Sequence, residues 1–456
     1  MISGTRQDIF DLFNRHKYSD AAEAAHAYLA KNPADEAVLH VLADSAMNSG
    51  LVDVGERAMA YLLAQKRTPH RLSSMAVVLS AKGQIDAALA LLKEALALDP
   101  AHARSWSLIS GLNSFTKSDP LITKAKRILR QSTTSPQSRR AVQFALSKAM
   151  NDLRKWDKAW DYAARASATA TPEYDPDGMD RWVSDIQESF NSDFLARRKG
   201  RGVESHAPIF IVGMPRSGTT LMEIILAASG QVTAMGEMRT IADLCEAAVQ
   251  DDAARGYPVH NHDWVHRWQN SAFTAAGEHV LQAVMRRNEG TLPERFSNKL
   301  PGNLLYLGQI GLMTPNAHII WMQRDPLDTC VSCFLGQFAA GHQYTNRIDW
   351  LARAAQAFQK AGDLLAPIVP NPVLKVRYED LVTRPEEEIR RVLDFLGLEW
   401  NAECLTPSPA GFTTTTRSVA QVRKPINAAS VGAWRRYANR IGPLAEALQI
   451  GAATAA

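Results

Sequence analysis

The chain is poor in cysteine, in excess charge and in long hydrophobic runs, and each shortage excludes a class of protein. Its four cysteines in 456 residues cannot form a disulfide framework, which favours a reducing compartment. Lys and Arg exceed Asp and Glu by only 51 − 47 = 4, too few for a protein that binds nucleic acid or membranes through net charge. No run approaches the ~18 apolar residues of a membrane-spanning helix, and the start of the chain lacks the basic and apolar regions of a secretory signal. We therefore expect a cytoplasmic protein with no membrane span.

Length and composition predict a globular protein of more than one domain. At ~150 residues per domain, this length suggests two or three domains, each able to bury a core. The 46% hydrophobic and 21% charged residues exclude wholesale disorder. The character of the sequence changes near residue 170. We expect a helical domain over 1–170, a linker over 171–206 and an α/β domain over 207–456.

The first 170 residues are rich in Ala and Leu at helical spacing, and they repeat. Asp20, Asp53 and Asp86 lie 33 residues apart, and Gly50 and Gly83 show the same interval. Such a period, with a glycine turn and small residues where helices cross, resembles tetratricopeptide repeats. A helical bundle with a chance period is the alternative. A repeat solenoid would offer a concave surface for recognition or assembly, and no chemistry.

Beyond residue 206, short β-like runs alternate with helical stretches. The runs are 209–212, 318–322 and 373–376. Strands separated by helices predict a parallel α/β sheet. The expected fold is therefore an α-helical repeat solenoid followed by an α/β domain.

The strand of this α/β domain that begins at Pro208 runs into a loop bounded by Gly213 and Gly218, and a helix follows the loop. Backbone N–H groups of such a loop, with the helix N-terminus, form a site for phosphate-like anions. The glycine spacing is that of the nucleotide-binding P-loop, but Thr219 stands where a Walker motif needs Lys. Arg216 supplies a cation instead. The predicted anion contacts are Arg216, Ser217, Gly218, Thr219 and Thr220.

The run PIFIVGMPRSGTTLME closely resembles the 5′-phosphosulfate loop of sulfotransferases that use 3′-phosphoadenosine-5′-phosphosulfate (PAPS). This resemblance implies a P-loop α/β fold and PAPS as cofactor, with no metal. The later run IIWMQRDPLDTCVSCF carries Arg324 and Ser332 eight residues apart, and it resembles the 3′-phosphate site of the same family. The resemblance implies that both residues hold that phosphate.

Five further segments resemble protein-tyrosine sulfotransferases and their bacterial relatives with tetratricopeptide repeats. The Gly-Glu pair ending at Glu237 matches the segment of the catalytic carboxylate, and Asn-Lys-Leu-Pro matches a segment whose lysine, here Lys299, reaches the transferred group. Other matches place Tyr378 and Ser418 against the nucleotide, with Arg435 in a C-terminal cofactor segment. In the animal enzymes the base follows the Gly-Glu pair, whereas this chain continues with Met and Arg. This chain also has one residue more between the loop and the Gly, so the assignment of the base to Glu237 depends on where that gap in the match is placed.

The resemblance implies transfer of a sulfuryl group to an acceptor hydroxyl. Arg216 would hold the phosphosulfate, Lys299 would stabilise the leaving oxygen, and Glu237 would accept the proton. A protein or peptide tyrosine is the favoured acceptor, with saccharide and lipid hydroxyls as alternatives, and the repeats would aid acceptor recognition. Two other functions stay open: a P-loop kinase or NTPase of small molecules, and a repeat scaffold with a nucleotide-binding domain that does no chemistry.

Two clusters that suggest metal binding are given other interpretations. Cys330 and Cys333 lack a partner pair and are predicted to lie in the core. His260, His262 and His266 fall in a polar loop without a supporting carboxylate pattern, and we expect all three on the surface.

Overall fold

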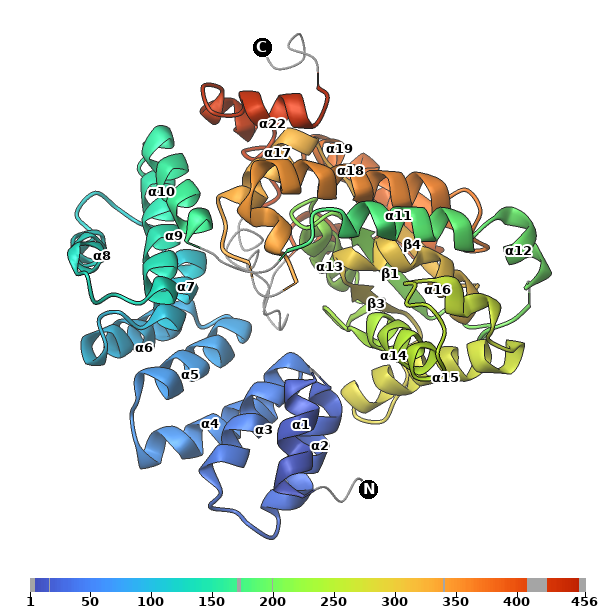
Figure 1. The fold of residues 1–456 in the computed structure, drawn as a ribbon, viewed down its shortest axis with the longest axis horizontal. Helices are drawn as coiled ribbons and strands as arrows, with labels where there is room; N and C mark the ends of the chain where they lie inside the picture. Colours follow the sequence, from blue (N-terminus) through green and yellow to red (C-terminus); the bar gives the residue numbers. More distant parts are fainter. Residues whose placement is uncertain are drawn as a thin grey trace. The chain divides into compact units, whose positions relative to one another are not determined.

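The computed structural model describes residues 5–15, 17–169, 174–198, 200–338, 341–407 and 425–450. These residues form two compact units (Figure 1). The first contains the described residues up to 169, and the second contains those from 174 onward.

The first unit is entirely helical among its described residues, as the sequence predicts. Consecutive helices pack side by side, for example α3 on α4 and α5 on α6. The helices are α1 (Arg6–Asn14), α2 (Tyr18–Leu29), α3 (Glu36–Asn48), α4 (Val52–Gln65), α5 (Pro69–Ala81), α6 (Ile85–Leu98), α7 (Ala103–Leu112), α8 (Pro120–Arg130), α9 (Pro136–Asp152) and α10 (Trp156–Ala168).

One turn recurs in this unit. Helices α3 and α5 both end at a left-handed glycine, Gly50 with φ 77° and Gly83 with φ 87°, and α9 ends at Arg154 with φ 56°. After each of these residues, the next amide donates a 2.8 Å hydrogen bond to a carbonyl five residues earlier. This arrangement satisfies carbonyls at the helix end and turns the chain into the following helix. The 33-residue period of the sequence therefore marks a repeated helix–turn–helix geometry.

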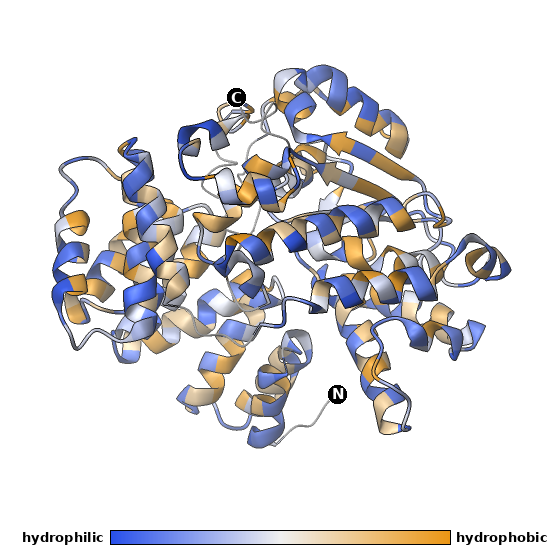
Figure 2. Ribbon diagram, turned by 45° about the horizontal axis from the view of Figure 1, so that its top comes forward, coloured by the Kyte–Doolittle hydropathy of each residue, from blue (hydrophilic) through white to orange (hydrophobic). Residues whose placement is uncertain are grey.

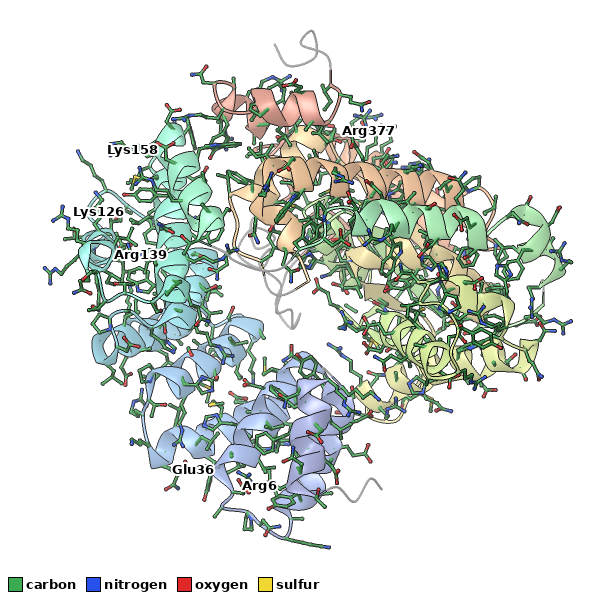
Figure 3. The ribbon with its side chains drawn as sticks, in the orientation of Figure 1. Arg6, Glu36, Lys126, Arg139, Lys158 and Arg377 are labelled. Atoms are coloured by element: carbon green, nitrogen blue, oxygen red, sulfur yellow. The ribbon has the colours of Figure 1, made fainter. Side chains whose placement is uncertain are left out.

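Charged side chains also join helices of the first unit. Arg71 is buried, and its guanidinium donates to the Leu62 carbonyl at 2.6 Å and to Glu36 at 2.5 Å. Arg6 donates to Asp35 at 2.9 Å; Figure 3 labels Arg6 and Glu36. A buried guanidinium needs such partners because an unpaired charge in the interior is costly.

The second unit is built on a parallel five-stranded sheet, as the sequence predicts. The strand order is β2-β3-β1-β4-β5. In the register of the sheet, Ile211 on β1 lies between Lys299 on β3 and Ile320 on β4. The strands are β1 (Pro208–Gly213), β2 (Thr233–Ala234), β3 (Phe296–Lys299), β4 (His318–Gln323) and β5 (Val373–Arg377).

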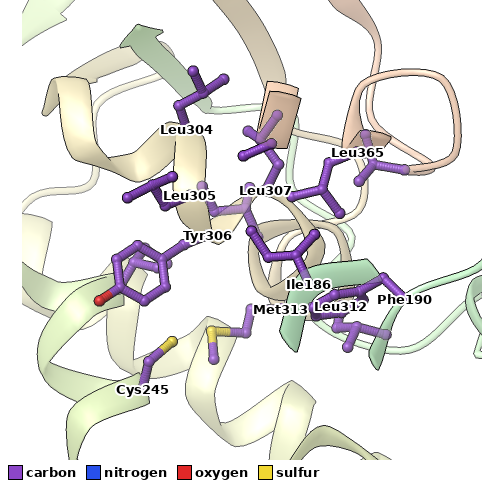
Figure 4. Close-up of a cluster of buried hydrophobic side chains, with 14 of the residues drawn as sticks. Ile186, Phe190, Cys245, Leu304, Leu305, Tyr306, Leu307, Leu312, Met313 and Leu365 are labelled. Atoms are coloured by element: carbon purple, nitrogen blue, oxygen red, sulfur yellow. The ribbon is translucent and has the colours of Figure 1, made fainter. Parts of the chain in front are cut away.

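Both faces of the sheet are covered, because alternate residues of its strands enter two different cores. Phe210 and Trp321 enter one core, and Ile211 and Met322 enter the other. The first core is built largely by α11, α14, α15, α16 and α18; Figure 4 shows part of it. The second core is closed by α13 and α20. In Figure 2 the strands are mainly hydrophobic, while helices carry hydrophilic outer faces.

The remaining elements of the second unit connect these strands. Helices α11 and α12 fall within 171–206, the range predicted as a linker, and their apolar side chains enter the first core. The elements are α11 (Gly178–Ser189), α12 (Ser192–Arg197), α13 (Thr219–Ala228), α14 (Thr240–Ala254), η1 (Asp263–His266), α15 (Asn270–Arg287), η2 (Pro301–Tyr306), α16 (Leu307–Met313), α17 (Pro326–Phe334), η3 (Gln343–Asn346), α18 (Ile348–Leu365), α19 (Tyr378–Thr383), α20 (Pro385–Leu396), η4 (Ala402–Leu405), η5 (Ala433–Tyr437) and α22 (Gly442–Ala447).

The prediction that His262 lies on the surface is wrong. His262 is buried, and its ring contacts Gln309, Trp182 and Tyr306. Aromatic rings of the first core enclose the imidazole and remove it from solvent. Burial lowers the pKa of His262 to about 4, which keeps the ring neutral.

The cysteines and the helices also bear on predictions made from the sequence. All four cysteines are free and buried, so Cys330 and Cys333 lie in the core as predicted. Among the described residues, no helix combines the length and apolar character needed to cross a membrane.

Candidate active site

The predicted site residues follow the carboxyl ends of the five parallel strands. Arg216 lies after β1, Glu237 after β2, Lys299 at the end of β3, Arg324 after β4 and Tyr378 after β5. The carboxyl ends of parallel strands meet at one edge of the sheet, where α/β proteins bind their ligands. The topology therefore explains why residues up to 162 positions apart share one region.

The loop after β1 has the backbone of an anion cradle. Arg216 and Gly218 have left-handed conformations, with φ of 74° and 102°, and α13 begins directly after Gly218. A side chain at position 218 would place its Cβ 2.6 Å from the ring of Tyr378, so only glycine fits. Loops of this kind direct backbone N–H groups toward one point, and the helix N-terminus adds positive potential. Ser217, Thr219 and Thr220 are buried at this point.

Two arginines, a serine and a tyrosine of the predicted site are in mutual contact. Arg324 donates to the Arg216 carbonyl at 3.0 Å, and its guanidinium lies 4.6 Å from the centre of the Tyr378 ring. Arg216 donates from Nε to Ser332 Oγ at 3.0 Å. Arg324 also donates to the Ser430 carbonyl at 2.6 Å. These contacts hold both guanidinium groups beside the loop.

This part of the site favours a negative ligand. Burial and the nearby Arg324 lower the pKa of Arg216. Within the described residues, Ser217 Oγ and Arg324 Nε are buried without a hydrogen-bond partner. Both residues line a cavity of about 640 Å³ beside the loop. A phosphate or sulfate would supply the acceptors and the negative charge that these groups require.

Lys299 and Glu237 form an ion pair at the same edge of the sheet. The Lys299 ammonium is fully buried and donates to Glu237 Oε1 at 2.5 Å, while the Glu237 side chain is 43% exposed. The backbone joins the same two segments, because the Lys299 amide donates to the Gly236 carbonyl at 2.9 Å. A buried ammonium depends on a negative partner. The pair thus combines a fixed cation with a carboxylate that solvent and an acceptor can reach.

Glu223 is a site residue that sequence reasoning missed. It lies on α13, fully buried, and its Oε1 accepts from the Gly236 amide at 2.9 Å and from Ser297 Oγ at 3.4 Å. Burial raises its pKa to about 7, opposed by Lys299 and reinforced by Glu237. A sequence signal exists: Glu223 is the charged residue in the otherwise uncharged helix TTLMEIILAA.

The C-terminal segment is attached to the site through Asp328 on α17. Asp328 accepts from the Gly432 amide at 2.7 Å and the Trp434 amide at 2.8 Å, and burial raises its pKa. This attachment brings the Ser430 carbonyl to Arg324. No contact supports the prediction that Arg435 binds the cofactor. Its guanidinium lies 4.6 Å from the Trp434 ring centre and makes no hydrogen bond or ion pair to another described site residue.

Two predictions are not tested by these contacts. Ser418 lies outside the described residues. The described residues contain no group of three or more His, Cys, Asp and Glu side chains suited to a metal ion. The expectation that no metal takes part stays a prediction.

Comparisons with known proteins find similarity to sulfotransferases. Residues 208–402 match the model of the sulfotransferase family. A protein of Aquifex aeolicus described as uncharacterized is 28% identical over 85% of this chain, and the chain spans about half of its length (52%). A putative protein-tyrosine sulfotransferase of Caenorhabditis briggsae is 28% identical over 50% of this chain and 80% of that protein.

Among solved structures, the chain is similar to the sulfotransferase domain of the Synechococcus PCC 7002 olefin synthase. The TM-score is 0.37 at 19% identity, over 51% of this chain and 89% of that domain.

Proposed function

We propose that the second unit, whose residues 208–402 form a sulfotransferase-family domain, transfers a sulfuryl group from PAPS to a hydroxyl group of an acceptor. One observation carries the proposal: Arg216, Ser332, Arg324 and Tyr378 surround the anion-binding loop in a single contact network. An ordinary strand–turn–helix connection has no need for two guanidinium groups held in this way.

The residues present fit PAPS. The loop amides and Arg216 would hold its 5′-phosphosulfate, and Arg324 with Ser332 would hold the 3′-phosphate. Tyr378, packed against Gly218, offers a ring face beside the nucleotide. PAPS, when bound, supplies the sulfuryl group and leaves as adenosine 3′,5′-bisphosphate.

Lys299 and Glu237 have complementary roles in this proposal. Lys299 keeps a positive charge in a buried position, where it opposes negative charge developing on a leaving oxygen. Glu237 accepts the proton of the acceptor hydroxyl, which its exposed carboxylate can approach. A donor anion near Lys299 would offer that ammonium a second negative partner, and so weaken its hold on Glu237.

The favoured acceptor is the phenolic hydroxyl of a tyrosine in a polypeptide. The name of the Caenorhabditis briggsae relative supports this acceptor class. The first unit, whose helices repeat a helix–turn–helix geometry, would recruit the acceptor polypeptide as a tetratricopeptide-like repeat domain. Saccharide and lipid hydroxyls are the competing acceptors, and an array of peptide, saccharide and lipid acceptors under one assay condition separates the three classes.

The first test is thermal stabilisation of the full chain by adenosine 3′,5′-bisphosphate compared with ADP and ATP. At 100 times its Kd, the bisphosphate should add ~2.7 kcal/mol to stability. The variant Arg324→Ala should lose the preference for the 3′-phosphate. Arg377→Ala is the matched control, because this arginine lies at the end of the neighbouring strand β5 but its side chain is 65% exposed. Stabilisation by ATP alone would contradict the proposal and favour a kinase or NTPase.

The second test is sulfuryl transfer from labelled PAPS by the variants Arg216→Ala and Lys299→Ala. Loss of one preorganised cation should reduce kcat by ~10²–10³-fold. Unchanged transfer in both variants would reject the assigned roles. Nucleotide binding without transfer to any hydroxyl acceptor would favour a scaffold that only binds the nucleotide.

A further inference from the structure

Glu223 is a buried carboxyl group that the proposed mechanism does not use. It lies four residues after Thr219 on the helix that begins at the anion-binding loop, and no part of it is exposed. Carboxylates are almost never fully buried unless they are paired. Within the described residues, Glu223 Oε2 makes no hydrogen bond. A buried acid with one oxygen unsatisfied calls for a functional explanation.

The contacts of Glu223 connect the donor loop to the proton acceptor. Its Oε1 accepts the amide N–H of Gly236, the left-handed residue (φ 63°) directly before Glu237. The same oxygen accepts from Ser297 on β3, two residues before Lys299. One carboxyl group of α13 therefore fixes both segments that carry the Lys299–Glu237 pair.

Several charged groups face Glu223 from the elements packed around it. Lys299 faces it from β3, Glu237 from the turn after β2, and Arg287 from the end of α15. His342, at the start of η3, faces Glu237. When Glu223 is ionised, two carboxylates, its own and that of Glu237, face the two cations Lys299 and Arg287. When Glu223 is protonated, this group has one negative charge fewer.

We propose that Glu223 is a positioning residue for proton transfer: it holds the Gly236–Glu237 turn on the helix of the donor loop and, when ionised, places a second negative charge beside the Glu237–Lys299 pair. This inference rests on the proposed function and deepens it. The proton that Glu223 releases goes to solvent, and the proton of the acceptor hydroxyl goes to Glu237.

Ionisation of Glu223 favours the reaction because like charges oppose each other. The charge of Glu237 opposes the ionisation of Glu223, and an ionised Glu223 adds negative potential at the carboxylate that receives the acceptor proton. Because burial raises the pKa of Glu223 to about 7, this charge appears as the pH rises through neutrality. Transfer should therefore increase over the same pH range.

The activity test compares wild type with Glu223→Gln from pH 6 to 9, using kcat/KM for the donor. The amide keeps the volume of the side chain and an acceptor for the Gly236 N–H, and removes the charge. The two proteins should be similar at pH 6, and wild type should gain roughly three- to tenfold by pH 8.5, the effect of one nearby like charge. Glu223→Ala, which also loses the acceptor, should fall below Glu223→Gln at every pH.

A control separates Glu223 from the nearby histidine. Burial lowers the pKa of His342, so its titration lies on the acid side of the expected rise. The variant His342→Gln should therefore keep the rise near pH 7. If His342→Gln abolishes the rise and Glu223→Gln keeps it, the inference is overturned. A Glu223→Gln variant that matches wild type at every pH, while Glu223→Ala is impaired, would also overturn it, since the group would then act only as a structural acceptor.

A second measurement needs no activity. The infrared carbonyl band of a protonated carboxylic acid should be present in wild type at pH 6, absent at pH 9, and absent in Glu223→Gln at both. Glu278→Gln, an exposed position on α15, is the matched control and should keep the band. Absence of the band in wild type at pH 6 would overturn this inference alone. Failure of wild type to bind adenosine 3′,5′-bisphosphate or to transfer sulfuryl groups would overturn the proposed function, and with it the role of Glu223.

Discussion

The buried carboxyl of Glu223 makes the stability of the protein depend on pH in a way that one substitution should remove. Burial raises its pKa from the ordinary 4.5 to about 7 in the folded protein. The folded state therefore binds a proton more tightly than the unfolded state, and between these two values it carries more protons. Stability must fall as pH rises through this interval. Gln does not titrate, so Glu223→Gln should escape the loss.

The size of the effect follows from the same two values. One pKa unit corresponds to 1.36 kcal/mol, so a difference of about 2.5 corresponds to about 3 kcal/mol. The amide variant forfeits part of a hydrogen bond to an ionised acceptor, which costs about 1 kcal/mol. Relative to wild type, Glu223→Gln should therefore gain most of this 3 kcal/mol in free energy of unfolding between pH 4.5 and 8.5.

The assay is urea unfolding of the full chain followed by tryptophan fluorescence at several pH values. Most tryptophans lie in the second unit, so the signal reports mainly on the α/β fold. Glu278→Gln should change with pH in parallel with wild type. A difference between wild type and Glu223→Gln that stays constant across pH would refute the reasoning, because it would mean that Glu223 ionises equally in both states.

Three further predictions concern backbone and segment positions. Gly218→Ala should destabilise the protein by at least ~1–2 kcal/mol and abolish nucleotide-induced stabilisation, because the new Cβ would clash with the Tyr378 ring. Gly230→Ala is the control: Gly230 also has a left-handed φ, of 73°, but open space around it, so this variant should cost only the backbone strain. Asp328→Ala should leave one buried and one partly buried amide of the C-terminal segment unsatisfied, at up to ~1–3 kcal/mol each, and limited proteolysis should then cleave residues 425–437 faster. Arg154→Gly should raise the midpoint of thermal unfolding, since glycine adopts its φ of 56° without the ~1 kcal/mol penalty; an unchanged midpoint would show that the turn is unstrained.

Much of the fold could be predicted from the sequence because its signals are local. The helical spacing of the first unit and the short apolar runs of the second each report on one element at a time. The recurring turn could be found only in part. Gly50 and Gly83 mark it, but Arg154 takes the same left-handed place without glycine. No composition signal reveals a position where packing imposes the backbone conformation.

The site residues also fall into those that local motifs reveal and those that depend on contacts with distant segments. Arg216, Arg324 and Lys299 belong to motifs, and the structure places all three at one edge of the sheet. Glu223 could not be assigned, because its significance depends on the Gly236 turn that α13 happens to face. His262 was misread for a related reason: a polar sequence around it gave no sign that aromatic rings from distant elements would enclose it.

The charges of the site are arranged in two parts with different electrostatic character. Near the loop, Arg324 contacts two backbone carbonyls and the Tyr378 ring, and Arg216 donates to the Ser332 hydroxyl. Asp328 lies 3.9 Å from Arg324, but its oxygens already accept two backbone amides. Lys299, in contrast, is matched directly by Glu237. The Nε of Arg324 has no hydrogen-bond partner among the described residues and can donate to a donor anion. The charges that act on Glu223 are those of Lys299, Glu237 and Arg287 and not those of the loop arginines, so the carboxyl of α13 should affect proton transfer more than donor binding.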